Sequence, residues 1–206
     1  MKEPKIGGLS FANLASTLGT LFPALNSQKS WDREYASGGW DRLDSEDELA
    51  RYAVITGFLT RVAPRPAVLD VGCGTGRLLQ VLSRVELTRY LGVDLSSEAV
   101  QRARALETPH ATFEVGSAET FETSETFDAI VFNEVAYYLR DPARVLARYH
   151  ERLRPGGLLI VSMFQCPPAS WAWRKLGRSF DTVDAVKVEN RLGSTWNVRV
   201  LRPRAR

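Results

Sequence analysis

Residues 68–77 read Val-Leu-Asp-Val-Gly-Cys-Gly-Thr-Gly-Arg, so a short apolar run leads directly into three glycines at alternate positions. A segment with helical apolar periodicity follows the glycines. This order predicts a strand, a tight glycine turn and a helix. Because glycines leave the backbone bare, the stretch also indicates a place where a cofactor can lie against the turn.

A carboxylate ends the next apolar run, in which residues 90–94 read Tyr-Leu-Gly-Val-Asp. Asp94 comes eighteen residues after Gly76, where a βαβ unit sets an acidic side chain against the hydroxyl pair of a ribose. The dinucleotide fingerprint needs its third glycine three positions after the second, and Arg77 stands there instead. The spacing therefore disfavours a nicotinamide cofactor.

These two segments resemble the first and second motifs of the class I S-adenosylmethionine-dependent methyltransferases. The resemblance implies that Asp94 accepts hydrogen bonds from both ribose hydroxyls and that Leu95 packs on the adenine. The alternative for Asp94 is that it ends a strand and caps the helix that starts near Ser96.

The glycine turn is assigned to the methionine part of the cofactor by the same resemblance. Gly72, Cys73 and Gly74 would let the backbone approach it. Asp70 would orient the loop or reach the amino group through water. Gly76 is expected to serve only close helix packing.

The rest of the chain predicts a regular alternation of strands and helices. Ser45 and Glu48 have the spacing of a capping box, which predicts the start of a helix that Pro64 ends. Asp141 with Pro142 predicts a helix N-cap, and residues 154–157, Arg-Pro-Gly-Gly, indicate a helix stop. We expect strands near residues 67–71, 90–94, 111–115, 128–133 and 158–163, and helices near residues 75–85, 97–106, 142–153 and 169–177.

The C-terminal part predicts an antiparallel hairpin, because residues 183–189 and 196–201 are strand-like and a short link joins them. Over residues 60–203 the pattern resembles the seven-stranded sheet of class I methyltransferases. The fold class we expect is α/β, with a doubly wound, mostly parallel, Rossmann-like sheet whose last strand runs antiparallel. We expect one domain over residues 1–206, with a helical cap in 1–60, including an amphipathic helix near residues 9–25, and a cofactor-binding core in 61–206.

A third motif, residues 116–119, reads Gly-Ser-Ala-Glu and resembles the Gly-Asp-Ala-Glu of the family. The resemblance implies that the backbone amide of Ala118 donates to the adenine ring. Ser117 replaces the acidic residue that accepts from the adenine amino group, and its uncharged hydroxyl can accept the same bond. Glu119 either acts as the acidic residue of this motif or is a solvated residue near a helix start.

The run after the fourth strand turns polar at Asn133 and Glu134, at the carboxyl edge where open α/β sheets bind ligands. Residues 134–139, Glu-Val-Ala-Tyr-Tyr-Leu, resemble a segment of the nodulation-type N-methyltransferases that act on amino-sugar oligomers. We expect Glu134 to orient the acceptor or take its proton, with Tyr137 as a neighbouring hydroxyl. The alternatives are a turn-capping carboxylate and core tyrosines.

The segment 31–41 combines aromatic residues with glycines just where the family's cap closes. Its aromatic side chains would face the sulfonium or a cationic acceptor. Tyr35 would reach the cofactor carboxylate, with Arg51 as a second contact. Packing of the cap alone is the alternative.

Composition narrows the class of protein. The chain has 206 residues, a net charge of +3 and scattered charges, and these features predict no nucleic-acid or membrane partner. Two cysteines and two isolated histidines favour a reducing cytoplasm and no metal site. The partner we expect is a small-molecule acceptor, and the oligomeric state stays open.

Three functions are compatible with these observations. The first is methyl transfer from S-adenosylmethionine to nitrogen or oxygen of a small polar, sugar-like acceptor. The second is a non-catalytic scaffold or regulatory subunit that binds the same cofactor. The third is a nucleotide-dependent oxidoreductase, against which Arg77 argues.

Overall fold

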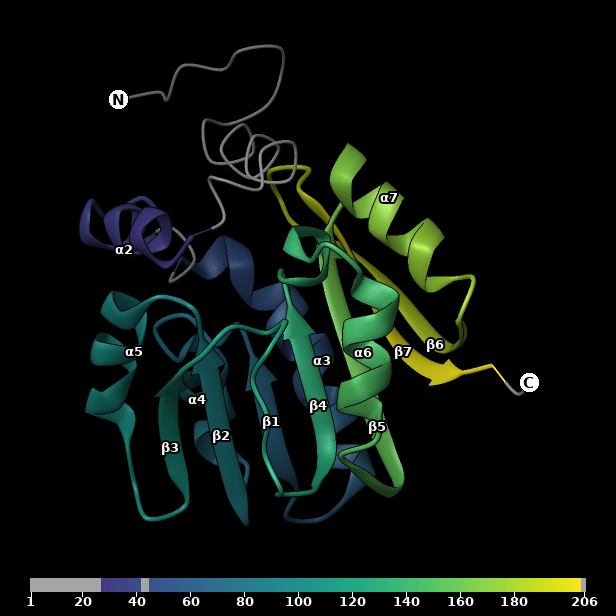
Figure 1. The fold of residues 1–206 in the computed structure, drawn as a ribbon, viewed down its shortest axis with the longest axis horizontal. Helices are drawn as coiled ribbons and strands as arrows, with labels where there is room; N and C mark the ends of the chain where they lie inside the picture. Colours follow the sequence, from purple (N-terminus) through teal and green to yellow (C-terminus); the bar gives the residue numbers. More distant parts are fainter. Residues whose placement is uncertain (1–26, 42–44, 205–206) are drawn as a thin grey trace.

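The protein is described by a computed structural model that covers residues 27–41 and 45–204. The helix expected near residues 9–25 lies outside this part, as do residues 205–206. Within it, one seven-stranded sheet has the order β3-β2-β1-β4-β5-β7-β6 (Figure 1). The strands are β1 (Ala67–Val71), β2 (Arg89–Asp94), β3 (Ala111–Val115), β4 (Phe127–Asn133), β5 (Leu153–Phe164), β6 (Phe180–Glu189) and β7 (Thr195–Pro203).

Strands β1 to β5 pair in parallel, and β7 lies antiparallel between β5 and β6. The hairpin expected at the C-terminus is therefore confirmed, as is the doubly wound α/β class. Its link is held by Asn190, whose side-chain oxygen accepts from the backbone N–H groups of Leu192 and Ser194. Gly193 takes φ +79° in this link.

Helices cover both faces of the sheet. They are α2 (Gln28–Ala36), α3 (Leu49–Val62), α4 (Arg77–Val81), α5 (Ser97–Ala103), α6 (Pro142–His150) and α7 (Pro167–Leu176). Short 3-10 turns occupy Glu46–Glu48, Leu82–Arg84, Arg104–Leu106 and Ala136–Tyr138. Helices α3, α4 and α5 pack on one face, and α6 and α7 pack on the other. The expected alternation of strands and helices is confirmed.

The core divides in two because successive strand residues point to opposite faces. In β1, Leu69 packs with the α6 and α7 side, and Val68 packs with the α3 to α5 side. Ile55 and Leu59 of α3 are fully buried against the second face. Burying such a side chain stabilises a fold by about 1.5–3 kcal/mol relative to leaving it exposed.

Helix α3 thus packs on the sheet although it lies mostly inside the expected cap of residues 1–60. The division of the chain into a cap and a core stays a prediction. We propose a boundary before α3, which leaves this helix with the core.

Two local expectations were wrong. The capping box does not form: Ser45 makes no side-chain cap, and Glu48 pairs with the guanidinium of Arg51 instead of reaching back to Ser45. Residues 154–157 do not stop a helix. Helix α6 ends earlier, at His150, and these residues form an irregularity in β5 opposite Asp128, whose carboxylate binds Arg154 at 2.8 Å.

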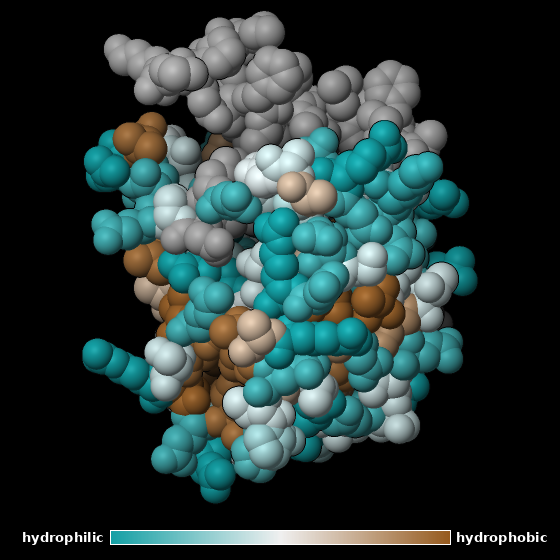
Figure 2. All heavy atoms as spheres, turned by 90° about the vertical axis from the view of Figure 1, so that its left-hand side faces the viewer, coloured by the Kyte–Doolittle hydropathy of each residue, from teal (hydrophilic) through white to brown (hydrophobic). Residues whose placement is uncertain are grey.

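The α6 start is as expected, since the Asp141 side chain accepts from the backbone N–H of Arg144 and Pro142 occupies the first turn. Seen from the β3 edge, the surface alternates between hydrophilic side chains and smaller hydrophobic patches (Figure 2). Such mixed surfaces are ordinary for folded domains. None of the helices in the described ranges has the length and apolarity needed to cross a bilayer.

Two glycines allow a test of the packing. A Cβ at Gly92 would lie 2.5 Å from Phe113 Cδ1 and 3.0 Å from Cys73 Sγ, whereas a Cβ at Gly57, in α3, would meet nothing within 4 Å. We expect Gly92→Ala to lower the free energy of unfolding by about 1–3 kcal/mol through overpacking. Gly57→Ala should raise it by up to about 1 kcal/mol, because alanine favours the helix. Urea denaturation measures both. Equal effects of the two substitutions would contradict this packing.

Candidate functional site

The chain reverses its direction of winding between β1 and β4, and ligands of doubly wound sheets bind in the crevice at such a switch point. A cavity of about 970 Å³ lies there, at the carboxyl ends of β1, β2 and β4. Every residue that the sequence analysis assigned to the site lines this cavity: Tyr35, Arg51, Asp70, Gly72, Cys73, Gly74, Asp94, Leu95, Ser117, Ala118, Asn133, Glu134 and Tyr137.

The glycine loop after β1 is held against the end of β2. The backbone N–H groups of Gly72 and Cys73 both donate to the carbonyl of Val93, at 2.7 and 3.1 Å. Gly72, Gly74 and Gly76 have φ values of +75°, +54° and +83°. Glycine adopts such backbone conformations without steric cost, so the loop needs it at these positions.

Side chains approach the same glycines closely. A Cβ at Gly72 would lie 2.1 Å from Val135 Cγ2, and one at Gly74 would lie 2.9 Å from the Tyr35 hydroxyl. The glycines thus make room for protein side chains as well as for the turn. Gly76 abuts side chains of the helix and strand beside it, since its Cβ would meet Leu106 at 2.8 Å, which agrees with the packing role expected for it.

Asp94 ties the two loops together. Its Oδ2 accepts from the backbone N–H of Gly74 at 2.9 Å, and its Oδ1 accepts from that of Ser96 at 2.8 Å. Burial raises the pKa of Asp94, and these two donors oppose the rise. The helix cap itself is Ser96, whose Oγ accepts from the N–H of Ala99.

Asp70 is buried below the loop, and its Oδ2 accepts from the Tyr90 hydroxyl at 2.6 Å. Its Oδ1 is buried and has no hydrogen-bond partner among the described residues. Burial raises the pKa of Asp70 to about 7, the Tyr90 hydroxyl lowers it, and the charge of Asp94 adds to the rise. Within the described residues, the Asp70 carboxyl is therefore hydrogen-bonded to the Tyr90 side chain and not to the glycine loop.

Glu134 stands at the end of β4 with φ +63°, which is unusual for a residue with a side chain. Its Oε2 accepts from the Tyr137 hydroxyl at 2.9 Å and from the Phe164 N–H at 3.0 Å. Burial and the charge of Glu134 raise the pKa of Tyr137 well above its usual range, so Tyr137 remains a hydroxyl donor. Tyr137 and the Phe164 backbone therefore fix the direction of the carboxylate.

Arg51 is fully buried in the cavity wall. It pairs with Glu48, donates from Nε to Asn133 Oδ1 at 3.2 Å, and donates from Nη2 to the Tyr52 hydroxyl at 3.4 Å. The guanidinium also lies over the Trp196 ring, 5.3 Å from its centroid. These contacts position Arg51 and Asn133 together.

The third motif is bonded mainly to the protein itself. Ser117 Oγ accepts from the N–H of Glu119 at 3.2 Å, and Glu119 Oε1 accepts from the N–H of Arg140 at 2.9 Å. The Ala118 carbonyl accepts from Arg148. Glu119 therefore joins two loops and is not simply a solvated residue.

An aromatic wall lines the cavity on the side of the expected cap. The Trp31 ring lies 5.5 Å from that of Trp40 and 4.9 Å from that of Tyr138, in an edge arrangement. Tyr137 lies 4.6 Å from Tyr138. Trp171 of α7 also lines the cavity. Edge and tilted contacts of this kind stabilise aromatic clusters.

Other lining residues were missed by the sequence analysis, among them Gln28, Thr75, Val135, Arg140, Pro167 and Pro168. Pro167 and Pro168 begin α7, just after β5 ends, so their position at the carboxyl end of a parallel strand was the available signal. His110 and His150 are not among the lining residues. The described ranges hold no group of three or more His, Cys, Asp or Glu side chains placed to bind a metal ion.

A model of the methyltransferase domain family matches residues 40–204. The chain belongs to this family. The match, together with the fold, confirms the expected class I S-adenosylmethionine-dependent methyltransferase, and S-adenosylmethionine is the cofactor of that class.

Curated relatives match over part of their length. Trans-aconitate 2-methyltransferase of Deinococcus radiodurans is 39% identical over 101 residues, which are 48% of this chain and 38% of the relative. Ubiquinone biosynthesis O-methyltransferase of Xanthomonas campestris pv. campestris is 32% identical over 126 residues, 58% of this chain and 52% of the relative. The chain thus spans about half or less of the length of these relatives.

Solved structures share the fold. N-methyltransferase NodS from Bradyrhizobium japonicum WM9, in complex with S-adenosyl-L-homocysteine, has a TM-score of 0.71 at 23% identity, covering 87% of this chain and 100% of that one. The [4+2]-cyclase SpnF has a TM-score of 0.63 at 17% identity, covering 78% and 82%. The expected resemblance to nodulation-type N-methyltransferases is confirmed, at the level of the fold.

The buried carboxyl of Asp70 predicts how the ligand-free protein responds to pH. An unfolded aspartate has a pKa of about 3.9, and the folded value is about 7. The stability that the protonated carboxyl contributes is therefore full below about pH 4 and is lost as the pH rises through about 7. Asp70→Asn carries no such titration. Relative to this variant, the wild type should lose about 1–4 kcal/mol of unfolding free energy between about pH 4 and 8.

Urea denaturation across this pH range measures the difference. Asp181→Asn, at an exposed position of β6, is the matched control and should follow the wild type. Parallel pH profiles for the wild type and Asp70→Asn would show that Asp70 is ionised in the folded protein over the whole range.

Proposed function

We propose that this chain transfers the methyl group of S-adenosylmethionine to nitrogen or oxygen of a small polar acceptor, with both molecules bound in the cavity at the switch point. The observation that carries the proposal is the joining of the glycine loop to the end of β2 by Asp94, inside a cavity of about 970 Å³. This volume lies at the upper end of the range for small-molecule sites. The family membership supports the reaction class.

The residues of the cavity fit the adenosyl cofactor. A carboxylate offers about four acceptor positions, and the two N–H donors of the loops use two of those on Asp94. Two ribose hydroxyls can use the others. Leu95, Ser117 and Ala118 would surround the adenine.

The methionine end would lie along Gly72, Cys73 and Gly74. The unpartnered, buried Oδ1 of Asp70 is an acceptor suited to a cationic amino group. Arg51 uses three of its five N–H donors on Glu48, Asn133 and Tyr52, so two are left for a carboxylate of the cofactor. Tyr35, over Gly74, would contact the same end.

When bound, the cofactor supplies an electrophilic methyl group on a sulfonium. The protein must then align the acceptor with that methyl group and exclude water, and alignment is worth about 7–11 kcal/mol in intramolecular models. Glu134 would orient the acceptor or accept its proton, with its carboxylate fixed by Tyr137 and Phe164. The aromatic wall of Trp31, Trp40 and Tyr138 would exclude water.

The alternative functions differ in their support. Family membership argues against the nucleotide-dependent oxidoreductase. The fold is shared with a [4+2]-cyclase and so does not by itself determine the reaction, which keeps a non-catalytic cofactor-binding subunit as the second candidate. The cytoplasmic location, the absence of nucleic-acid and membrane partners, and the oligomeric state stay predictions or open questions.

Asp94→Ala tests the cofactor site. The ribose hydroxyls would lose a charged acceptor, so we expect affinity for S-adenosylhomocysteine to fall by about 100-fold or more. Isothermal titration calorimetry measures the dissociation constant. Asp181→Asn should bind like the wild type. An unchanged affinity in a folded Asp94→Ala protein would remove Asp94 from the cofactor site.

Glu134→Gln tests the acceptor site, because the amide keeps the shape of the side chain but cannot take a proton. We expect kcat to fall by about 10²–10⁴-fold if Glu134 is the base, with cofactor affinity changed by less than about 2-fold. The assay measures S-adenosylhomocysteine release with a panel of amines, amino sugars, phenols and carboxylic acids. The panel spans the N- and O-methylation named in the relatives.

The panel also separates the leading functions. Cofactor binding without release on any acceptor would favour the non-catalytic subunit. Turnover by Glu134→Gln at the wild-type rate would exclude Glu134 from the chemistry while leaving methyl transfer in place.

A further inference from the structure

Helix α2 forms part of the cavity wall, although it precedes the sheet in the chain. Trp31 and Tyr35 of this helix line the cavity, and so does Trp40 just after it. Asp32 lies next to Trp31 but is not among the lining residues. Figure 1 places α2 beside the upper end of α5. What holds α2 there therefore determines the shape of the cavity.

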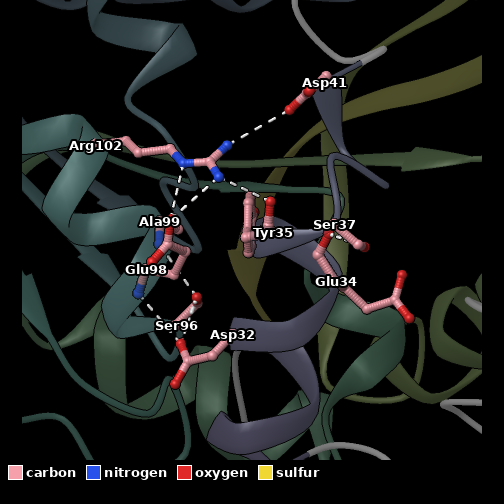
Figure 3. A network of polar contacts seen from close by, with 9 residues as sticks. All are labelled: Asp32, Glu34, Tyr35, Ser37, Asp41, Ser96, Glu98, Ala99 and Arg102. Carbon is pink, nitrogen blue, oxygen red and sulfur yellow. Dashed lines mark hydrogen bonds and ion pairs between the residues drawn. The ribbon is translucent and has the colours of Figure 1, made fainter.

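The first attachment is Asp32, whose carboxylate meets the start of α5 (Figure 3). Oδ1 accepts from Ser96 Oγ at 2.7 Å and from the Glu98 N–H at 3.2 Å, and Oδ2 accepts from Ser97 Oγ at 3.1 Å. Burial opposes the charged form, but these hydrogen bonds together lower the pKa of Asp32. A charged acceptor makes stronger hydrogen bonds than a neutral one.

The second attachment is Arg102, one of the last residues of α5. Its Nη2 donates to the backbone carbonyl of Tyr35 at 2.9 Å, and its Nη1 lies 3.5 Å from Asp41 Oδ1. Glu98 on the same helix holds the guanidinium through Oε1. Arg102 thus fastens the end of α2 and the segment after it, and it also lies outside the set of lining residues.

Both attachments are connected, through neighbouring residues, to the two loops that Asp94 joins. Ser96 donates its hydroxyl to Asp32 and its backbone N–H to Asp94, which also accepts from the N–H of Gly74. The hydroxyl of Tyr35, three residues after Asp32 on α2, lies close to Gly74, since a Cβ built there would be 2.9 Å from it. Displacing α2 would therefore disturb both loops that Asp94 joins.

We propose that Asp32 and Arg102 are positioning residues that fasten α2 over the cavity, and that release of this α2 clasp limits the rate at which the cofactor product leaves. The α2 clasp comprises the contacts of Asp32 with Ser96, Ser97 and Glu98 and those of Arg102 with Tyr35 and Asp41. The inference rests on the proposed function, since it places the adenosyl cofactor in this cavity.

Asp32→Ala removes the first attachment without touching the cavity. In the ligand-free protein we expect amide exchange in α2 to become faster by about 10-fold or more, with exchange in the sheet unchanged. Hydrogen exchange with mass spectrometry measures this, and it also reports whether the fold is intact. Arg102→Lys should give a similar but smaller change, since lysine cannot make all three contacts of the guanidinium.

The same variants are then loaded with S-adenosylhomocysteine, and its dissociation is followed by stopped-flow tryptophan fluorescence after a chase. We expect dissociation about 10-fold faster in Asp32→Ala than in the wild type. Asp32→Asn, which keeps the size of the side chain, should be intermediate. Glu34→Ala removes an exposed carboxylate of the same helix outside the clasp and should leave both readouts at wild-type values.

Two results would overturn the clasp and are distinct from failure of the proposed function. If S-adenosylhomocysteine binds normally and leaves Asp32→Ala at the wild-type rate, the α2 clasp alone is contradicted, even if amide exchange in α2 becomes faster. If S-adenosylhomocysteine does not bind to the wild type, both the proposed function and the α2 clasp are contradicted. If Asp32→Ala loses protection from hydrogen exchange across the sheet, its fold is damaged. The dissociation rate of S-adenosylhomocysteine from Asp32→Asn is then compared with the wild-type rate, and an unchanged rate contradicts the α2 clasp.

Discussion

The candidate site depends on the two hydrogen bonds that the carboxylate of Asp94 accepts. It accepts from Gly74 in the loop after β1 and from Ser96 in the turn before α5, so one side chain fixes the two loops that border the switch point. A carboxylate with so little solvent around it is costly unless donors surround it. The two backbone donors meet that requirement and also set the direction in which its remaining acceptor positions point.

Short-range patterns explain why much of this arrangement could be predicted from the sequence. The glycine positions specify a turn with positive φ, and the distance from Gly76 to Asp94 is that expected for the helix and second strand of a βαβ unit. Asn133 and Glu134 could be assigned to the site because they follow a buried apolar strand, at the edge of the sheet where ligands bind. Because parallel strands bring their carboxyl ends to one edge, residues far apart in the chain could be assigned to one cavity without any knowledge of their contacts.

Contacts between segments far apart in the chain could not be predicted from the sequence. Asp32 meets Ser96 across 64 residues, and Arg51 meets Asn133 across 82 residues, and neither pairing follows from periodicity or motif spacing. The failed capping box has a local cause instead, because the buried guanidinium of Arg51, three residues further along the chain, competes for Glu48. Sequence patterns thus located the site, whereas long-range polar contacts determine how its walls are held.

The most direct measurement of the central claim is a crystal structure of the protein grown with S-adenosylhomocysteine. The account predicts the ribose hydroxyls within hydrogen-bond distance of the Asp94 carboxylate, the adenine against Leu95, and the sulfur facing the side of the cavity formed by Asn133 and Glu134. Ligand density outside this cavity, or a ribose directed away from Asp94, would contradict it.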